Sequence, residues 1–210
     1  MIDIRKLVAK HALVSDQVSP HEIEVILTKF QAVLDHNIAG DVVELGCYKG
    51  TTSLFLARLL KEYGSPKQLW LYDSFQGLPD KSAADDSRLG DSFCPGALKA
   101  TKAEVVRNFA HANLPQPIIK KAWFSDLAED DVPDQICFAY FDGDYYDSIR
   151  DSFRVCEQRL APGAVIVVDD YSNPSLPGAA KAVDEWCERN AGRVKNFSVQ
   201  DSLGVITLVV

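Results

Sequence analysis

The segment FAYFDGD at residues 138–144 is followed along the chain by a second segment of the same kind, AVIVVDDY at residues 164–171. Each is an apolar run, rich in β-branched or aromatic residues, that ends abruptly in carboxylates. This pattern is typical of a strand buried in a parallel sheet. Open α/β sheets bind their ligands beyond the carboxyl ends of the strands. We therefore predict that Asp142, Asp169 and Asp170 converge on one hard cation.

Strands and helices are predicted to alternate around these two segments. The expected strands are 42–45, 68–73, 117–121, 136–142 and 164–169, and the expected helices are 51–63, 101–110, 146–160 and 179–190. This alternation is typical of a doubly wound parallel sheet. Two further strand-like runs, 194–199 and 204–210, are close enough to form an antiparallel hairpin. We expect an α/β, Rossmann-like fold with a mostly parallel seven-stranded sheet that ends in this hairpin.

The first forty residues have a different pattern, because apolar residues recur there at helical spacing behind a capping box at 19–22. We expect residues 1–39 to form an N-terminal helical cap and residues 40–210 to form the main domain. Residues 79–96 show no clear periodicity, and a loop of that length is more often a functional lid than an accident.

Charge and composition exclude several classes of partner. The formal net charge is −8, so no basic stripe is available for nucleic acid or anionic lipid. The N-terminus has no secretory apolar region, and no segment approaches a membrane span. We expect a cytoplasmic protein. The five cysteines are widely spaced, which favours reduced thiols over a zinc site.

The first strand runs into the segment ELGCYKGTT at residues 44–52. Gly46 lets the backbone turn tightly beside a ligand, and Gly50 opens the following helix. The segment lacks the G-x-G-x-x-G fingerprint, so a nicotinamide oxidoreductase is disfavoured. It suits a ligand with an amino-acid end, whose cationic group the carboxylate of Glu44 would attract. Thr51 and Thr52 complete this predicted site, although the segment could also be a simple strand-to-helix turn.

The second strand ends in Asp73, which is placed to accept both ribose hydroxyls of a nucleoside. Ser74 and Phe75 follow it, and Phe75 could cover a base or simply fill the core. Ser125 and Asp126, after the third strand, are candidates for the exocyclic amine of adenine, with a helix cap as the alternative for Asp126.

Five segments together resemble the macrocin O-methyltransferase family, whose members include the mycinamicin and novobiocin sugar O-methyltransferases. They are GDVVELG (40–46), DSFQGLP (73–79), WFSD (123–126), DGDYYDS (142–148) and the run from PG (162–163) through DDY (169–171). The resemblance covers roughly residues 40–186. It implies the class I methyltransferase fold, S-adenosylmethionine as methyl donor, a divalent metal, usually Mg²⁺, and a sugar hydroxyl as acceptor.

The resemblance also implies roles for individual residues. Asp142, Asp169 and Asp170 match the family's metal-binding aspartates, and Asp142 is also the proposed general base. Glu44, Gly46 and Asp73 match its cofactor site. The chain departs from the family in three places: its short N-terminal part, the 79–96 loop, and residues 47–49 (CYK) between the two glycines of the turn. The acceptor, the methylated position and the pathway are therefore left open.

The predicted chemistry is metal-assisted O-methylation. A sugar hydroxyl has a pKa far above neutral, and Mg²⁺ can polarise its oxygen while Asp142 takes the proton. A catechol-like or phenolic acceptor would use the same metal chemistry, and a non-catalytic protein that binds S-adenosylmethionine or another metabolite is a further alternative. Strand-end acids can also be caps or ion-pair residues, which is the alternative for Asp169 and Asp170. We expect Asp144 and Asp147 to be caps or outer residues that support the metal ligands. The expected partner is a small glycoside or natural product, and a homo-oligomer is left open.

Overall fold

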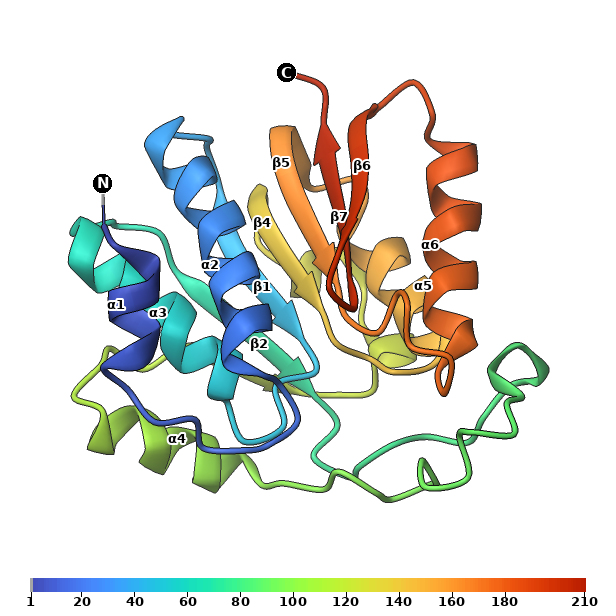
Figure 1. Cartoon of the computed structure of the whole chain (residues 1–210). Coiled ribbons are helices and arrows are strands. Elements are labelled where there is room, and N and C mark those ends of the chain that lie inside the picture. The colour runs from blue at the N-terminus through green and yellow to red at the C-terminus, as the bar shows by residue number, and fades with distance from the viewer. Residues whose placement is uncertain (1) are drawn as a thin grey trace.

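The computed structural model describes residues 2–210, which form a seven-stranded sheet in the order β3-β2-β1-β4-β5-β7-β6 (Figure 1). The strands are β1 (Asp41–Leu45), β2 (Leu69–Asp73), β3 (Ile118–Lys121), β4 (Ile136–Phe141), β5 (Leu160–Val168), β6 (Val194–Gln200) and β7 (Leu203–Leu208). The first five pair in parallel, whereas β7 pairs antiparallel with both β5 and β6. The predicted α/β fold with its C-terminal hairpin is confirmed.

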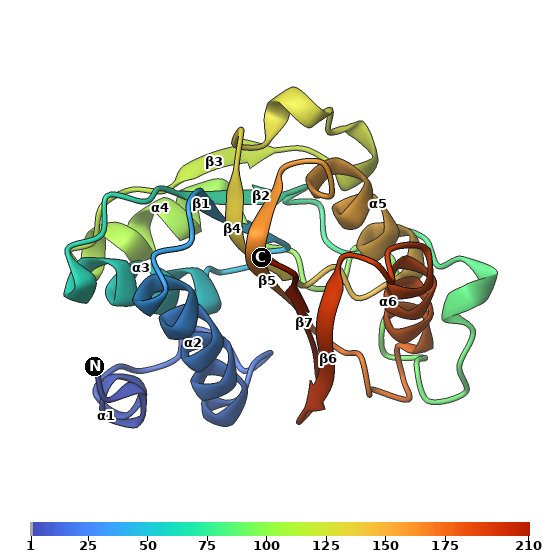
Figure 2. The ribbon, with the colours of Figure 1, turned by 90° about the horizontal axis from the view of Figure 1, so that it is seen from above.

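Six α-helices of the described residues cover the two faces of the sheet (Figure 2). They are α1 (Ile4–Ala9), α2 (Pro20–Asp35), α3 (Thr51–Tyr63), α4 (Lys102–His111), α5 (Tyr146–Cys156) and α6 (Pro177–Arg189). Helices α1 to α4 pack on one face, and α5 and α6 pack on the other. None of the helices between residues 2 and 210 is both long and apolar enough to cross a membrane.

The central strand β4 is buried on both faces, which explains its continuous apolar sequence. All six residues of β4 are buried. Phe138 and Tyr140 join the core beneath α1 to α4, whereas Ala139 and Phe141 join the core beneath α5 and α6. Because side chains alternate along a strand, β4 contributes to both cores and its end is held rigidly between them.

Helix α2 begins with the predicted capping box. Ser19 Oγ accepts from the backbone N–H of Glu22, and Glu22 Oε2 accepts from the N–H of Ser19. Glu22 also accepts a hydrogen bond from the Ser202 hydroxyl, between β6 and β7. Phe30 packs against Phe138, with ring centroids 4.9 Å apart. The N-terminal segment is thus packed directly on the sheet, and its separation at residue 39 stays a prediction.

The junction between α5 and β5 differs from the expectation. The helix ends at Cys156 rather than at residue 160, and β5 begins at Leu160 rather than at residue 164. Leu160 continues the helical spacing in the sequence, but it pairs with Ile136 of β4, and the register shifts before the next paired residues. Three more residues lie between the paired positions on β5 than on β4, and apolar spacing does not reveal such an irregularity at the start of a strand.

Three short 3₁₀ helices complete the chain: η1 (Ala83–Asp85), η2 (Phe124–Asp126) and η3 (Glu129–Asp131). The first lies within the 79–96 loop, and the second follows β3 at the edge where the other parallel strands also end. Phe124 of the second lines the cleft described below.

Candidate active site

The carboxyl ends of β2, β1, β4 and β5 are aligned at one edge of the sheet. Leu45 is paired with Tyr72 on one side and with Phe141 on the other, and Phe141 is paired with Val168. The residues that follow these positions therefore emerge side by side, as the sequence predicts for a ligand site at this edge.

Three carboxylates meet there. Asp142, Asp169 and Asp170 each offer an oxygen, and these oxygens lie within 4.8 Å of one another. The Tyr140 hydroxyl donates to Asp169 Oδ2 at 2.6 Å, and the N–H of Asp170 donates to Asp169 Oδ1 at 2.8 Å. Asn173 Nδ2 donates to Asp170 Oδ1 at 2.8 Å. The cluster is held in place by neutral donors rather than by cations.

Burial and mutual repulsion disfavour ionisation of the three acids. Burial, followed by the charge of Asp169, raises the pKa of Asp142 well above its usual value. Burial and the charge of Asp170 raise the pKa of Asp169 to about 7, and burial also raises the pKa of Asp170. No Lys or Arg between residues 2 and 210 forms an ion pair with any of them. An all-oxygen donor set of this kind fits a hard divalent cation such as Mg²⁺.

Asp144, predicted from the sequence as a cap or as an outer residue that supports the metal ligands, is a fourth acid that lines the same cleft. Its side chain is 9% exposed and its backbone is left-handed, with φ of 60°. Burial, followed by the charges of Asp170 and Asp169, raises its pKa well above the usual value. The D-G-D spacing of residues 142–144 was the available signal, because the intervening Gly143 allows the chain to turn a second acid into the cleft.

Gly46 makes the close approach that the glycine turn requires. Its φ is +97°, and a Cβ at this position would lie 1.8 Å from the carbonyl oxygen of Asp142. Only glycine therefore permits β1 to end directly against the end of β4. The turn after β1 thus leads the backbone along the acid cluster.

Asp73 organises this turn from the neighbouring strand. Its Oδ2 accepts from the backbone N–H groups of Cys47 and Tyr48 at 3.0 and 2.9 Å, and its Oδ1 accepts from the N–H of Phe75 at 2.7 Å. Burial raises the pKa of Asp73 despite these three hydrogen bonds. The side chain also lines the cleft, so one carboxylate both shapes the glycine turn and faces the ligand space.

A cleft of about 920 Å³, including its open mouth, connects these features. Of the predicted site residues, those that line it are Gly46, Asp73, Ser74, Asp142, Asp169 and Asp170. Its lining also includes the apolar side chains of Leu78, Phe93 and Leu98. The 79–96 loop supplies Phe93 and so borders the cleft, and its role as a lid stays a prediction.

Other predicted residues lie outside the cleft lining. Glu44 is buried beneath the turn, where its Oε2 accepts from Ser53 Oγ at 2.6 Å. Thr51 and Thr52 are buried in the first turn of α3 behind Gly50, and Phe75 is 5% exposed. Their assigned roles in cofactor binding stay predictions.

The segment after β3 contains Ser125 and Asp126, whose assigned roles at the adenine stay predictions. Ser125 and Asp126 are exposed, whereas the preceding residues Trp123 and Phe124 line the cleft. The sequence analysis quoted both aromatics but assigned them no role. Both residues come shortly after the end of β3, which could have indicated that they line the cleft, because the residues that first leave a parallel strand border the ligand space.

Comparison with known proteins identifies relatives among the sugar methyltransferases. A family model described as macrocin-O-methyltransferase (TylF) matches residues 20–205. The chain is 28% identical over 172 residues to demethyldecarbamoylnovobiocin O-methyltransferase of Streptomyces niveus, covering 78% of this chain and 64% of that protein. It is 29% identical over 168 residues to mycinamicin III 3''-O-methyltransferase of Micromonospora griseorubida, covering 76% and 65%.

A third relative is 8-demethyl-8-(2,3-dimethoxy-alpha-L-rhamnosyl)-tetracenomycin-C 4'-O-methyltransferase of Streptomyces olivaceus. It is 29% identical over 148 residues, which cover 68% of this chain and 57% of that protein. The matched regions thus span 57% to 65% of the lengths of these curated relatives.

Solved structures share the fold. The O-methyltransferase NovP superposes with a TM-score of 0.79 at 24% identity, covering 92% of this chain and 81% of that chain. The calicheamicin methyltransferase CalS11 superposes with a TM-score of 0.72 at 16% identity, covering 97% and 89%. The class I methyltransferase fold expected from the sequence is therefore confirmed.

Proposed function

The chain belongs to the macrocin O-methyltransferase family, and from this premise we propose that it transfers a methyl group from S-adenosylmethionine to a hydroxyl of a sugar or glycosylated small molecule, with a divalent metal. The observation that carries the proposal is the cluster of Asp142, Asp169 and Asp170 in one cleft with Gly46 and Asp73. We assign this chemistry to residues 40–210 and treat residues 1–39 as a helical cap.

Asp142, Asp169 and Asp170 would hold Mg²⁺. When bound, the metal supplies Lewis-acid polarisation of the acceptor oxygen and a fixed orientation for two neighbouring hydroxyls. The Tyr140 hydroxyl and the Asn173 amide hold two of the three carboxylates. The protein therefore contributes a preformed ligand set whose charge has no protein counter-ion among the described residues.

The donor would bind along the glycine turn, with its ribose at Asp73. Oδ2 of Asp73 accepts two backbone N–H groups and Oδ1 accepts one, so a lone pair of Oδ1 stays open to a ribose hydroxyl without loss of the turn. The acids of the cleft also favour the positive sulfonium group by charge. Much of the rate enhancement would come from alignment of the acceptor oxygen, methyl carbon and sulfur.

Two acids are candidates for the proton acceptor. Asp142 is the base assigned from the sequence, and Asp144 is the second candidate, since its buried carboxylate lines the same cleft and lies outside the three-acid cluster. In both carboxyls, burial raises the pKa, which makes each a stronger base once ionised. Asp144→Asn separates the two: loss of turnover with retained Mg²⁺ affinity would assign the base to Asp144, and retained turnover would leave the role with Asp142, whose own substitution also removes a metal ligand.

A phenolic or catechol-like acceptor is the second candidate, favoured by the apolar side chains of Leu78, Phe93 and Leu98 in the cleft wall. A flat aromatic ring with two adjacent hydroxyls would fit such a wall and the same metal. A panel of glycosides and catechols assayed in parallel distinguishes the two acceptor classes.

The test is calorimetric titration of S-adenosylmethionine into chelator-treated protein, followed by a methyl-transfer assay on the acceptor panel with and without Mg²⁺. We expect donor binding, Mg²⁺-dependent transfer, and a loss of at least about a hundredfold in transfer with Asp169→Asn. The control is Asp147→Asn, because Asp147 is half-exposed and pairs with Arg150 rather than lining the cleft. Donor binding without turnover would indicate a binding protein, and no donor binding would refute the proposal.

A further inference from the structure

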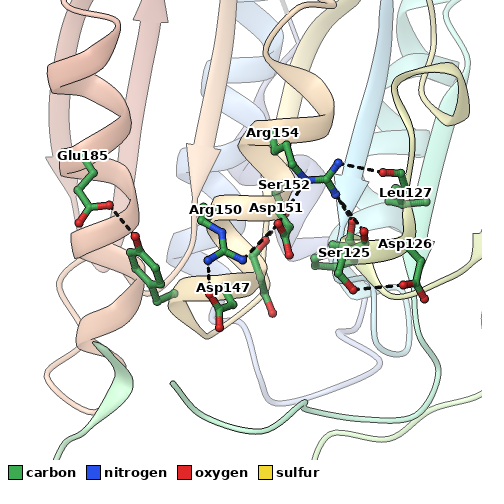
Figure 3. Close-up of polar contacts among 12 residues, drawn as sticks. Ser125, Asp126, Leu127, Asp147, Arg150, Asp151, Ser152, Arg154 and Glu185 are labelled. Carbon is green, nitrogen blue, oxygen red and sulfur yellow. Dashed lines mark hydrogen bonds and ion pairs between the residues drawn. The ribbon is translucent and has the colours of Figure 1, made fainter. Parts of the chain in front are cut away.

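The guanidinium of Arg154, in α5, donates hydrogen bonds to three backbone carbonyls of the segment that follows β3 (Figure 3). Its Nη2 donates to the carbonyl oxygens of Phe124 at 2.8 Å and Ser125 at 3.3 Å, and its Nη1 donates to that of Leu127 at 3.1 Å. A single guanidinium thus bridges two carbonyls of η2 and the carbonyl of Leu127, the residue that follows η2. Arg supplies such a fork of donors, whereas Lys supplies one point charge.

Asp151 fixes the orientation of this guanidinium. Asp151 is 8% exposed, and its Oδ1 accepts from Arg154 Nε at 3.3 Å. With Nε engaged by the carboxylate, the two terminal nitrogens of Arg154 are directed towards the carbonyls of the 124–127 segment. The charge pair is partly solvated, so its role is geometric more than energetic.

The clamped segment forms one wall of the cleft. Trp123 and Phe124 line the cleft, and the N–H of Ala122 donates to the carbonyl of Asp73 at 3.0 Å. Asp73 is also paired in register with Lys121 of β3. The wall therefore starts directly beside the carboxylate to which we assign the ribose.

Phe124 connects this wall to the acid cluster. A Cβ placed on Gly143 would lie 3.3 Å from Cε2 of Phe124, so the ring rests against the glycine between Asp142 and Asp144. The carbonyl of this same Phe124 makes the shortest of the Arg154 contacts. A shift of the 124–127 segment would therefore move an aromatic ring that borders both the donor side and the acids.

We propose that Arg154 is a positioning residue for the methyl donor: by clamping the carbonyls of residues 124–127, it fixes Trp123 and Phe124 as the wall against which the nucleoside end of S-adenosylmethionine binds. This inference rests on the proposed function. Arg154 does not line the cleft and acts only through the clamped segment.

Helix α5 also provides a matched control. Arg150 lies one turn before Arg154, its side chain is 47% exposed against 45%, and it also contacts Asp151 Oδ1. Its other partner is Asp147, and it makes no hydrogen bond to the 124–127 segment. Removal of Arg150 therefore changes the charge and the Asp151 pairing but leaves the clamp in place.

The experiment compares the wild-type chain with Arg154→Gln, Arg154→Lys and Arg150→Gln. S-adenosylmethionine and S-adenosylhomocysteine are titrated calorimetrically into each protein, Mg²⁺ is titrated separately, and hydrogen exchange is followed in peptides covering residues 118–130. We expect Arg154→Gln to weaken both nucleoside ligands at least tenfold, Arg154→Lys to be intermediate, and Arg150→Gln to bind within twofold of wild type. Mg²⁺ affinity should stay within threefold in all variants, and exchange should accelerate at 124–127 only in the Arg154 variants.

Nucleoside affinity within twofold of wild type in folded Arg154→Gln would overturn the inference, as would an equal loss in Arg150→Gln. A purely structural role would lower the unfolding temperature without this selective loss of nucleoside affinity. If Arg154→Gln does not fold, the same criteria for nucleoside affinity and for hydrogen exchange at 124–127 are applied to Arg154→Lys. Failure of the proposed function is separate, because it appears in the wild-type protein as absence of S-adenosylmethionine binding.

Discussion

The hydroxyl of Tyr140 donates a 2.6 Å hydrogen bond to Oδ2 of Asp169. Tyr140 lies in β4 and Asp169 directly follows β5, so this bond joins two neighbouring strand ends beneath the acid cluster. Burial, followed by the charges of Asp142 and Asp169, raises the pKa of Tyr140 well above its usual value. The hydroxyl therefore remains a donor and stabilises the ionised form of Asp169, the form that binds a metal.

Tyr140→Phe should weaken Mg²⁺ binding roughly tenfold, because loss of a hydrogen bond to a charged group costs about 1.5 to 3 kcal/mol. Isothermal titration with Mg²⁺ measures the effect. The control is Tyr72→Phe, which removes another mostly buried hydroxyl, bonded to the carbonyl of Asp131 at 2.9 Å. That variant should lose some stability with unchanged Mg²⁺ affinity, and equal weakening in the two variants would contradict the role assigned to Tyr140.

Gly46→Ala should destabilise the chain by more than about 3 kcal/mol, because it combines a left-handed backbone with a severe clash. The new Cβ would lie 1.8 Å from the Asp142 carbonyl oxygen. The control is Gly64→Ala at the end of α3, where φ is +57° and no atom lies within 4 Å of the built Cβ. Its expected cost is about 1 kcal/mol. Urea unfolding of both variants measures the difference, and similar costs would show that the β1 and β4 ends can separate without penalty.

The acid cluster could be predicted from the sequence because its position depends on strand order and strand ends alone. Apolar runs define β4 and β5, and parallel strands end at one edge. Asp144 was predicted only as a cap or an outer residue of the metal site, because its place in the cleft lining depends on one left-handed backbone angle that the sequence does not reveal. Arg154 was missed because its partners are backbone carbonyls about thirty residues away, and a carbonyl has no signature in the sequence. Contacts of this kind require the packing of α5 against η2 to be known.

Glu44 makes stability depend on pH. Burial raises its pKa from 4.5 to about 8, so between these values the folded chain holds a proton that the unfolded chain releases. Its contribution to stability is therefore complete below pH 4.5 and is lost as the pH rises towards 8. Glu44→Gln should remove this pH dependence. The free energy of unfolding of the wild type, minus that of the variant, should therefore fall by up to about 1.4 kcal/mol per pH unit between pH 4.5 and about 8. Urea unfolding at pH 5, 6, 7 and 8 measures it, and a constant difference would refute the assignment.

Asp85 anchors the 79–96 loop beside the cleft. Its side chain is fully buried. Oδ1 accepts from the backbone N–H of Tyr146 at 2.7 Å, and Oδ2 accepts from the N–H and hydroxyl of Ser82 at 2.9 and 2.7 Å. Tyr146 is the first residue of α5, so the carboxylate binds the loop to a helix N-terminus, where negative charge is favourable. Further along the loop, the hydroxyl of Ser87 donates to the carbonyl of Pro174 at 2.8 Å.

Asp85→Ala should release this loop, because it leaves the N–H of Tyr146 without its acceptor and opens a cavity beneath the segment. Since Phe93 of the same loop lines the cleft, we expect the KM for the acceptor to rise about tenfold or more, while the donor Kd stays within twofold, because Gly46 and Asp73 do not depend on the loop. Limited proteolysis should cut within 79–96 faster than in wild type. The control is Asp86→Ala, which removes an exposed carboxylate one position along and should leave both constants unchanged. If Asp85→Ala instead weakens the donor and leaves the acceptor KM unchanged, the loop borders the nucleoside rather than the acceptor.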